Sequence, residues 1–172
     1  MLFLNKQIFS FFNPWRKNMF WIVCILIFTL LTIFIWKRKN LTLFEGLAIF
    51  LLSSTINQNI LNIVTVNMKL IRIPKEVNEF FEAFVYRTLV IPLLVVIFLD
   101  IYTHSKTMTG KIIVIVFWII LLTSFEYIVE HLSIFHFIRW NIWYSLMEWL
   151  FVIIASLLCH RFLYYLHTKG SR

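Results

Sequence analysis

The sequence predicts an all-α fold, a polytopic transmembrane helical bundle with about five spans. Hydrophobic residues make up 61% of the 172-residue chain and charged residues only 14%, whereas soluble domains have roughly 45–50% and 25%. The chain also contains only three Gly and three Pro, so few breaks interrupt its apolar runs. This composition excludes a soluble enzyme, a disordered tail, a collagen-like fibre and a disulfide-rich secreted domain.

Five apolar runs are each long enough to cross a bilayer, which takes about 20 mostly apolar residues. Residues 1–18 precede them and are expected to lie along the membrane surface through their aromatic and aliphatic side chains. No linker is long enough to separate two domains, so residues 1–172 are predicted to form a single integral membrane domain. The predicted spans are about 19–36, 41–66, 81–102, 112–132 and 141–166.

The net charge of +8 comes from basic residues that cluster between the apolar runs, as at positions 16–17 and 37–39. Basic residues at such positions anchor helix ends to lipid headgroups, which favours the lipid bilayer over nucleic acid as the partner. With five spans, Arg87 and Arg161 lie within spans, and the other Lys and Arg residues divide equally between the two sides, seven to seven. The positive-inside rule therefore gives no orientation. Cys24 and Cys159 each lie inside an apolar run and are predicted to be packing residues.

Polar side chains inside the predicted spans fall at one depth, toward the end of the bundle that carries the second and fourth loops. Arginine stays ionised in proteins, and a charge inside the bilayer is costly unless it is paired or hydrated. We therefore expect Arg87 to pair with Glu126 or Glu148. At 100° per residue, Gln58 and Asn62 share one helix face. The predicted intramembrane cluster comprises Gln58, Asn62, Arg87, Glu126, Glu130, Asn141 and Glu148.

Three roles are open to this cluster. It can hold the helices together, since lipid provides no hydrophobic drive for helix association, or it can form a ligand, ion or proton site. A metal site is the third, but Glu130 and His131 are adjacent and point about 100° apart, and no H-E-x-x-H motif is present. The chain also lacks the G-x-S-x-G motif of hydrolases. No catalytic residue, metal or cofactor is therefore predicted.

The stretch from Phe125 to Trp149 combines aromatic residues with a few polar ones. It contains Glu126-Tyr127, then His131, then Trp-Asn-Ile-Trp-Tyr-Ser at 140–145. This pattern resembles the last two spans of a family of uncharacterised small five-span integral membrane proteins from endospore-forming Gram-positive bacteria. The third span, with Pro92, is similar to its counterpart in that family. The resemblance implies a five-span architecture in a bacterial cell membrane, and it implies no activity or cofactor.

Two functional hypotheses follow. The first is a non-enzymatic membrane protein that acts through helix contacts, as a homo-oligomer or as a subunit of a membrane complex. The alternative is a small transporter or channel component that uses the intramembrane polar cluster. An aqueous cavity reaching Glu126 and Glu148 would favour transport or catalysis, whereas a dry and fully paired cluster would favour the structural role.

Overall fold

The structure of the protein is a computed structural model that describes residues 41–72, 77–131 and 135–170. It also describes residues 25, 26, 28–30, 32 and 33, which are helical. The predicted interfacial segment 1–18 lies outside the described residues, and so does most of the predicted first span, 19–36.

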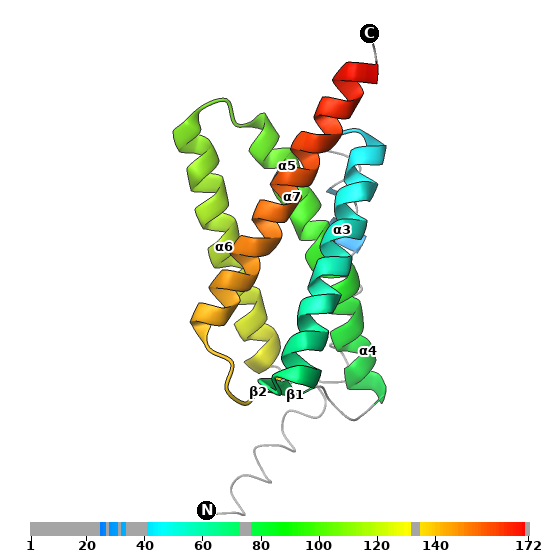
Figure 1. Cartoon of the computed structure of the whole chain (residues 1–172). Coiled ribbons are helices and arrows are strands. Elements are labelled where there is room, and N and C mark those ends of the chain that lie inside the picture. Colours follow the sequence, from blue (N-terminus) through cyan, green and yellow to red (C-terminus); the bar gives the residue numbers. More distant parts are fainter. Residues whose placement is uncertain are drawn as a thin grey trace, which may run out of the picture.

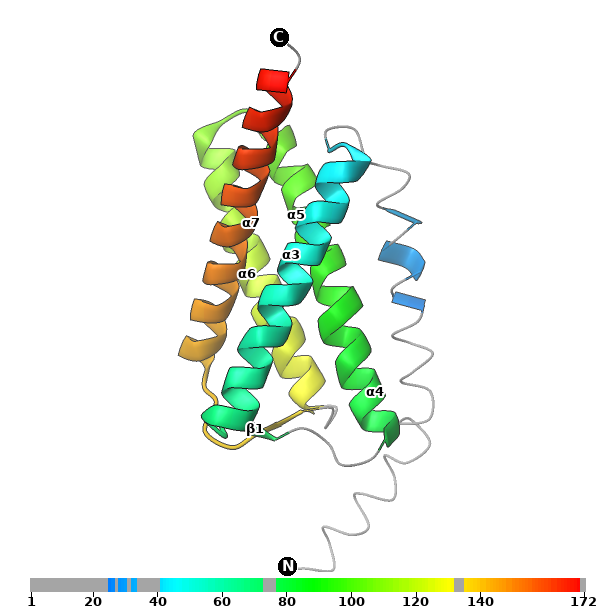
Figure 2. The same ribbon diagram turned by 45° about the vertical axis from the view of Figure 1, so that its right-hand side comes forward.

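Four long helical stretches make up most of the described part of the chain. The segments are α3 (Leu43–Asn62), η1 (Ile63–Asn67), α4 (Val77–Val85), η2 (Tyr86–Val90), α5 (Ile91–His104), α6 (Met108–His131) and α7 (Ile142–Gly170). Two of the stretches contain a short π-helical segment: η1 extends α3, and η2 joins α4 to α5. The chain is helical without a break through α3–η1 and through α4–η2–α5. Figure 2 shows α4 running directly into α5 beside α3.

Each of the four stretches is long and apolar enough to cross a membrane. The spanning ranges are Leu43–Asn67, Phe80–His104, Met108–His131 and Ile142–His167. The predicted helical bundle is therefore confirmed, and the protein is a multi-pass membrane protein. The described residues contain four spans against the five predicted, and the missing one is the first, which falls mostly outside the described range.

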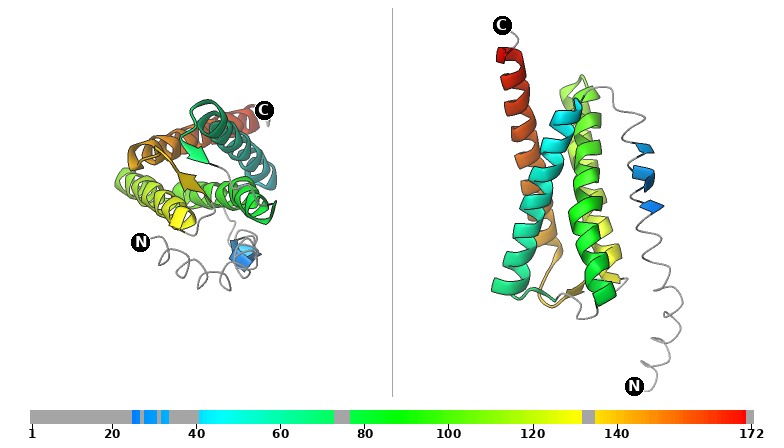
Figure 3. Two further views of the ribbon diagram at one scale, coloured as in Figure 1. Left: turned by 90° about the horizontal axis from the view of Figure 1, so that it is seen from below. Right: turned by 90° about the vertical axis from the view of Figure 1, so that its right-hand side faces the viewer.

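The helix from Phe80 to His104 is the central element of the bundle. Of its most apolar stretch, 67% is buried, compared with 28–33% for the other three spans. Seen from below, α3, the α4–α5 helix, α6 and α7 lie side by side (Figure 3). The residues buried on several faces of α5 include Ile91, Val95, Phe98 and Leu99, each 0% exposed. Most of this helix, including Arg87, therefore faces protein rather than lipid.

A two-residue β-ladder, which the sequence did not indicate, ties two loops together at one end of the bundle. β1 (Ile71–Arg72) pairs antiparallel with β2 (His136–Phe137), with Ile71 opposite Phe137. The Leu70 carbonyl oxygen also accepts hydrogen bonds from the backbone amides of Ile138 and Arg139, at 2.9 and 3.2 Å. In Figure 1 this ladder lies at the end opposite the α5–α6 turn. The two loops thus share one side of the membrane, as predicted.

The start of α3 is fixed by a capping box. The Glu45 backbone amide donates to Thr42 Oγ1 at 3.2 Å, and the Thr42 amide donates to Glu45 Oε2 at 2.8 Å. This reciprocal pair satisfies two amides that the helix itself leaves free. Glu45 therefore has a local structural role at the end of the helix.

Candidate functional site

Arg87 lies in the π-helical segment η2, one turn before Pro92 in the central helix. Proline has no backbone N–H, so it cannot donate to a carbonyl in the preceding turn. Side chains of α3 donate hydrogen bonds to the carbonyl oxygens of Arg87 and Thr88 in this turn. The Asn57 side-chain amide donates to the Arg87 carbonyl oxygen at 3.0 Å, and the Ser54 hydroxyl donates to that of Thr88 at 3.4 Å. The break in the helical hydrogen bonds is thereby satisfied within the protein, as a membrane-spanning helix requires.

Asn57 holds Arg87 by both of its polar atoms. While its amide nitrogen donates to the Arg87 backbone, its Oδ1 accepts a hydrogen bond from Arg87 Nη1 at 2.7 Å. Asn57 is 0% exposed, so both bonds form away from water and lipid. This pair fixes the rotation of α3 about its own axis relative to the central helix.

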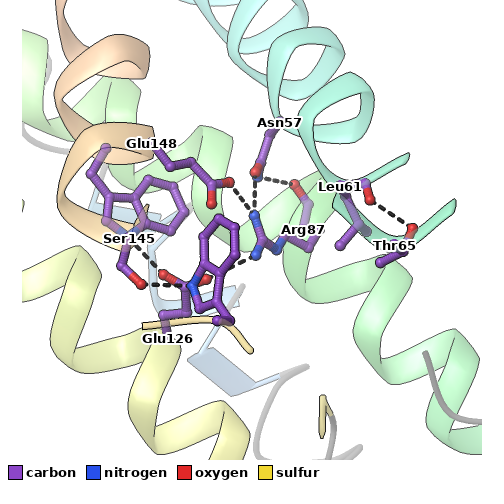
Figure 4. A network of polar contacts seen from close by, with 9 residues as sticks. Asn57, Leu61, Thr65, Arg87, Glu126, Ser145 and Glu148 are labelled. Atoms are coloured by element: carbon purple, nitrogen blue, oxygen red, sulfur yellow. Dashed lines mark hydrogen bonds and ion pairs between the residues drawn. The ribbon is translucent and has the colours of Figure 1, made fainter. Parts of the chain in front are cut away.

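Two carboxylates from two further helices complete the cluster around the guanidinium. Arg87 Nη1 lies 2.5 Å from Glu148 Oε1 on α7, and Nη2 lies 3.1 Å from Glu126 Oε1 on α6. Counted over the whole residue, Arg87 and Glu126 are 1% exposed and Glu148 is 6% exposed. Figure 4 shows the guanidinium between the two acidic side chains and Asn57. The predicted ion pairing is confirmed, and Arg87 contacts both candidate carboxylates rather than one of them.

Aromatic side chains enclose the ion cluster. The Arg87 guanidinium carbon lies 5.4 Å from the centre of the Phe135 ring and 5.7 Å from that of Trp149. Trp149 Nε1 also donates to Glu126 Oε2 at 3.1 Å. Cation–π contacts of this kind gain strength when the cation is shielded from water. The rings therefore stabilise Arg87 and exclude solvent from its ion pairs.

A second tryptophan extends the network toward the start of α7. The Trp140 indole N–H donates to Ser145 Oγ at 2.8 Å, and Ser145 hydrogen-bonds to Glu126. Ser145 is 0% exposed. The Trp-Asn-x-Trp-Tyr-Ser stretch thus connects the loop end of the bundle to the buried carboxylate.

Two other predicted site residues lie beside the cluster. Gln58 is half-buried, and its amide nitrogen donates to Thr88 Oγ1 at 2.6 Å, so it joins α3 to the central helix next to Arg87. Glu130 is half-buried one turn closer to the loop than Glu126. Among the described residues, the ion pairs of Arg87 go to Glu126 and Glu148 and not to Glu130.

The expected positions of Asn62 and Asn141 were wrong. Asn62 is exposed, because the inward face of α3 is centred on Ser53 and Asn57, and a residue five positions after Asn57 points roughly 140° away at 3.6 residues per turn. Asn141 is exposed as well and caps α7. Its Oδ1 accepts from the backbone amides of Trp143 and Tyr144, at 3.1 and 3.3 Å. Capping is the role that asparagine favours immediately before a helix.

The sequence did not identify Asn57 and Trp149 as site residues. Asn57 hydrogen-bonds to Arg87 and Trp149 hydrogen-bonds to Glu126. Asn57 belongs to the amide-rich half of its span, but the face chosen there ran through Gln58 and was shifted by one residue. Trp149 follows Glu148 directly, and a tryptophan inside a span instead of at its end was the signal that could have identified it.

The chemistry of this site is that of a closed, hydrogen-bonded ion cluster. The described residues include no group of three or more His, Cys, Asp or Glu side chains placed to hold a metal ion. Arg87, Glu126 and Glu148 come from three different helices, and Asn57 contributes a polar side chain from a fourth helix, α3. Such an arrangement couples the positions of all four spans to one another.

Comparison with known proteins adds no relative. No protein-family profile, curated protein or solved structure matches the chain.

Proposed function

We propose that this multi-pass protein acts through helix contacts in the membrane, as a homo-oligomer whose copies meet along the outer face of α3. The observation that carries the proposal is a row of polar side chains on that face. Thr55, Asn59 and Asn62 are all exposed and recur at the spacing of one helix face. The Thr55 hydroxyl and one N–H of Asn59 donate to carbonyl oxygens of α3 itself, both at 2.8 Å. The remaining polar atoms of the outward-facing carboxamides are costly in lipid, and a contacting helix would satisfy them.

The closed state of the ion cluster supports the same proposal. Inside the bundle, Arg87 forms ion pairs with Glu126 and Glu148, and these ion pairs join the helices of a single copy. A buried and paired cluster favours the structural role over transport. The α3 face is then the polar surface through which the protein would contact another membrane helix.

A second copy of the chain fits this face by its chemistry. Each asparagine side chain has both donors and an acceptor, so two identical faces can satisfy one another. A two-fold axis brings identical faces together, and this is the commonest symmetry of homo-oligomers. We further propose that the membrane is the cell membrane of a bacterium, on the basis of the family resemblance of residues 125–149.

Disulfide cross-linking in membranes tests the proposal. Leu51 and Val66 flank the polar row on the same face and are 63% and 66% exposed, while Leu158 on α7 is 62% exposed and provides a matched control. Each is changed to Cys in a chain in which Cys24 and Cys159 are Ser. We expect a cross-linked dimer for Leu51→Cys or Val66→Cys and none for Leu158→Cys.

The dimer should disappear when Asn59→Leu and Asn62→Leu are added, and it should persist with Ser124→Leu, which changes an exposed polar residue on α6. Equal cross-linking at all three cysteine positions would contradict the proposal. So would a band that joins the chain to a different protein through Leu51→Cys, since this would identify a subunit of a hetero-complex.

A further inference from the structure

The buried cluster contains one cation and two carboxyl groups. Arg87 contacts Glu126 and Glu148, and all three side chains are no more than 2% exposed. With both carboxyl groups ionised, the cluster would carry one uncompensated negative charge inside the bundle. Removing an unpaired charge from water is expensive, and the surrounding bilayer provides no counter-ion at that depth.

No second cation among the described residues balances this charge. The described groups that bind the carboxyl groups are Arg87 from η2 and, from α7, the Trp149 indole and the Ser145 hydroxyl. Asn57 from α3 binds the Arg87 guanidinium, and the Tyr86 phenol of η2 is buried. Of these, only Arg87 is cationic. The ion pairs of Glu126 and Glu148 within the described part of the chain both go to this one residue.

The hydrogen bonds leave a place for a proton. Glu126 accepts from Arg87 through Oε1 and from Trp149 through Oε2. Glu148 accepts from Arg87 through Oε1, and the hydrogen bonds between the described residues of the cluster use this oxygen and not Oε2. Figure 4 shows this second oxygen apart from the guanidinium. A carboxyl oxygen without a donor can itself carry hydrogen.

We propose that the cluster is a binding site for one proton, which the carboxyl group of Glu148 carries on Oε2 while Glu126 stays ionised beside Arg87. The proton comes from water, and its binding converts one carboxylate into a neutral carboxylic acid. The cluster then contains one guanidinium and one carboxylate, and its net charge is zero. This inference concerns the interior of one copy and does not depend on the proposed oligomer.

Infrared spectroscopy of the purified protein in lipid bilayers at neutral pH tests the proposal. A protonated carboxylic acid has a C=O stretching band separate from that of a carboxylate, so we expect one such band in the wild-type protein. Both Glu126→Gln and Glu148→Gln should abolish the band, because the remaining carboxylate then pairs one-to-one with Arg87. Glutamine has the shape of the protonated acid, so both variants should keep their helix content and their elution in gel filtration.

Glu130→Gln is the matched control, since Glu130 is half-buried on the same helix as Glu126. This variant should retain the band at full intensity. Absence of the band from the wild-type protein would overturn the proposal without reference to any variant. Its persistence in either Glu126→Gln or Glu148→Gln would also overturn it, because the proton would then not depend on the balance between the two carboxyl groups.

Discussion

Replacing Arg87 with Met removes the only cation of the cluster and keeps an unbranched side chain, shorter than that of arginine. The change eliminates three hydrogen bonds, those to Asn57 Oδ1, Glu148 Oε1 and Glu126 Oε1. It leaves two carboxyl groups without a cation in a site that is almost fully buried. Loss of one partner of a buried ion pair costs about 3–5 kcal/mol, so we expect the free energy of unfolding to fall by about that amount.

Unfolding in a detergent mixture of increasing sodium dodecyl sulfate content, followed by circular dichroism, measures this loss. The control is Arg161→Met, because Arg161 is exposed on α7. We expect the control to change stability by no more than about 0.5 kcal/mol, as surface substitutions usually do.

Neutralising the remaining carboxyl groups should restore part of the stability. The triple variant Arg87→Met, Glu126→Gln, Glu148→Gln has no formal charge in the cluster, and we expect it to be more stable than Arg87→Met alone. Independent sites would give additive losses. A triple variant as unstable as the sum of its single changes would therefore refute the reasoning that the three side chains form one charge-balanced unit.

Three further predictions follow from the same structure. Asn57→Leu should lower the free energy of unfolding by about 1–3 kcal/mol, because it leaves buried groups of Arg87 without partners, and the same denaturation assay measures it. Trp149→Phe keeps a ring beside Arg87 but removes the N–H that binds Glu126, so it should cost less than Arg87→Met; an equal or larger loss would contradict the assigned contact. Reporter fusions after residues 77 and 137 should both lie on one side of the membrane, and fusions after residue 105 and at the C-terminus should lie on the other side. Fusions after 77 and 137 that lie on opposite sides would be incompatible with the β1–β2 ladder.

The architecture and the ion pairs could be predicted from the sequence because both depend on the cost of polar groups in lipid. That cost makes the spans long and apolar, and it requires Arg87 to find a carboxylate at the same depth. Helix period and chain direction were then enough to select Glu126 and Glu148.

The rotation of α3 could not be predicted in this way. Its amide-rich half offers Gln58 and Asn62 on one face and Asn57 about 100° from Gln58, and both faces are polar. The face of α3 that points inward is set by the π-helical turn of η2 and by Pro92. Together they leave carbonyl groups of the central helix free, and Asn57 and Ser54 donate hydrogen bonds to these groups. The β1–β2 ladder was missed because two-residue strands have no periodic pattern.

The central claim is that the Arg87 guanidinium contacts both Glu126 and Glu148 inside the membrane-spanning bundle. Solid-state NMR in bilayers, with 15N-labelled arginine and 13C-labelled glutamate, measures this contact through the dipolar coupling between guanidinium nitrogens and carboxyl carbons. We predict two short-range couplings, of which one disappears in Glu126→Gln and the other in Glu148→Gln, while both persist in Glu130→Gln. A spectrum without either coupling, or one unchanged by both substitutions, would contradict the claim.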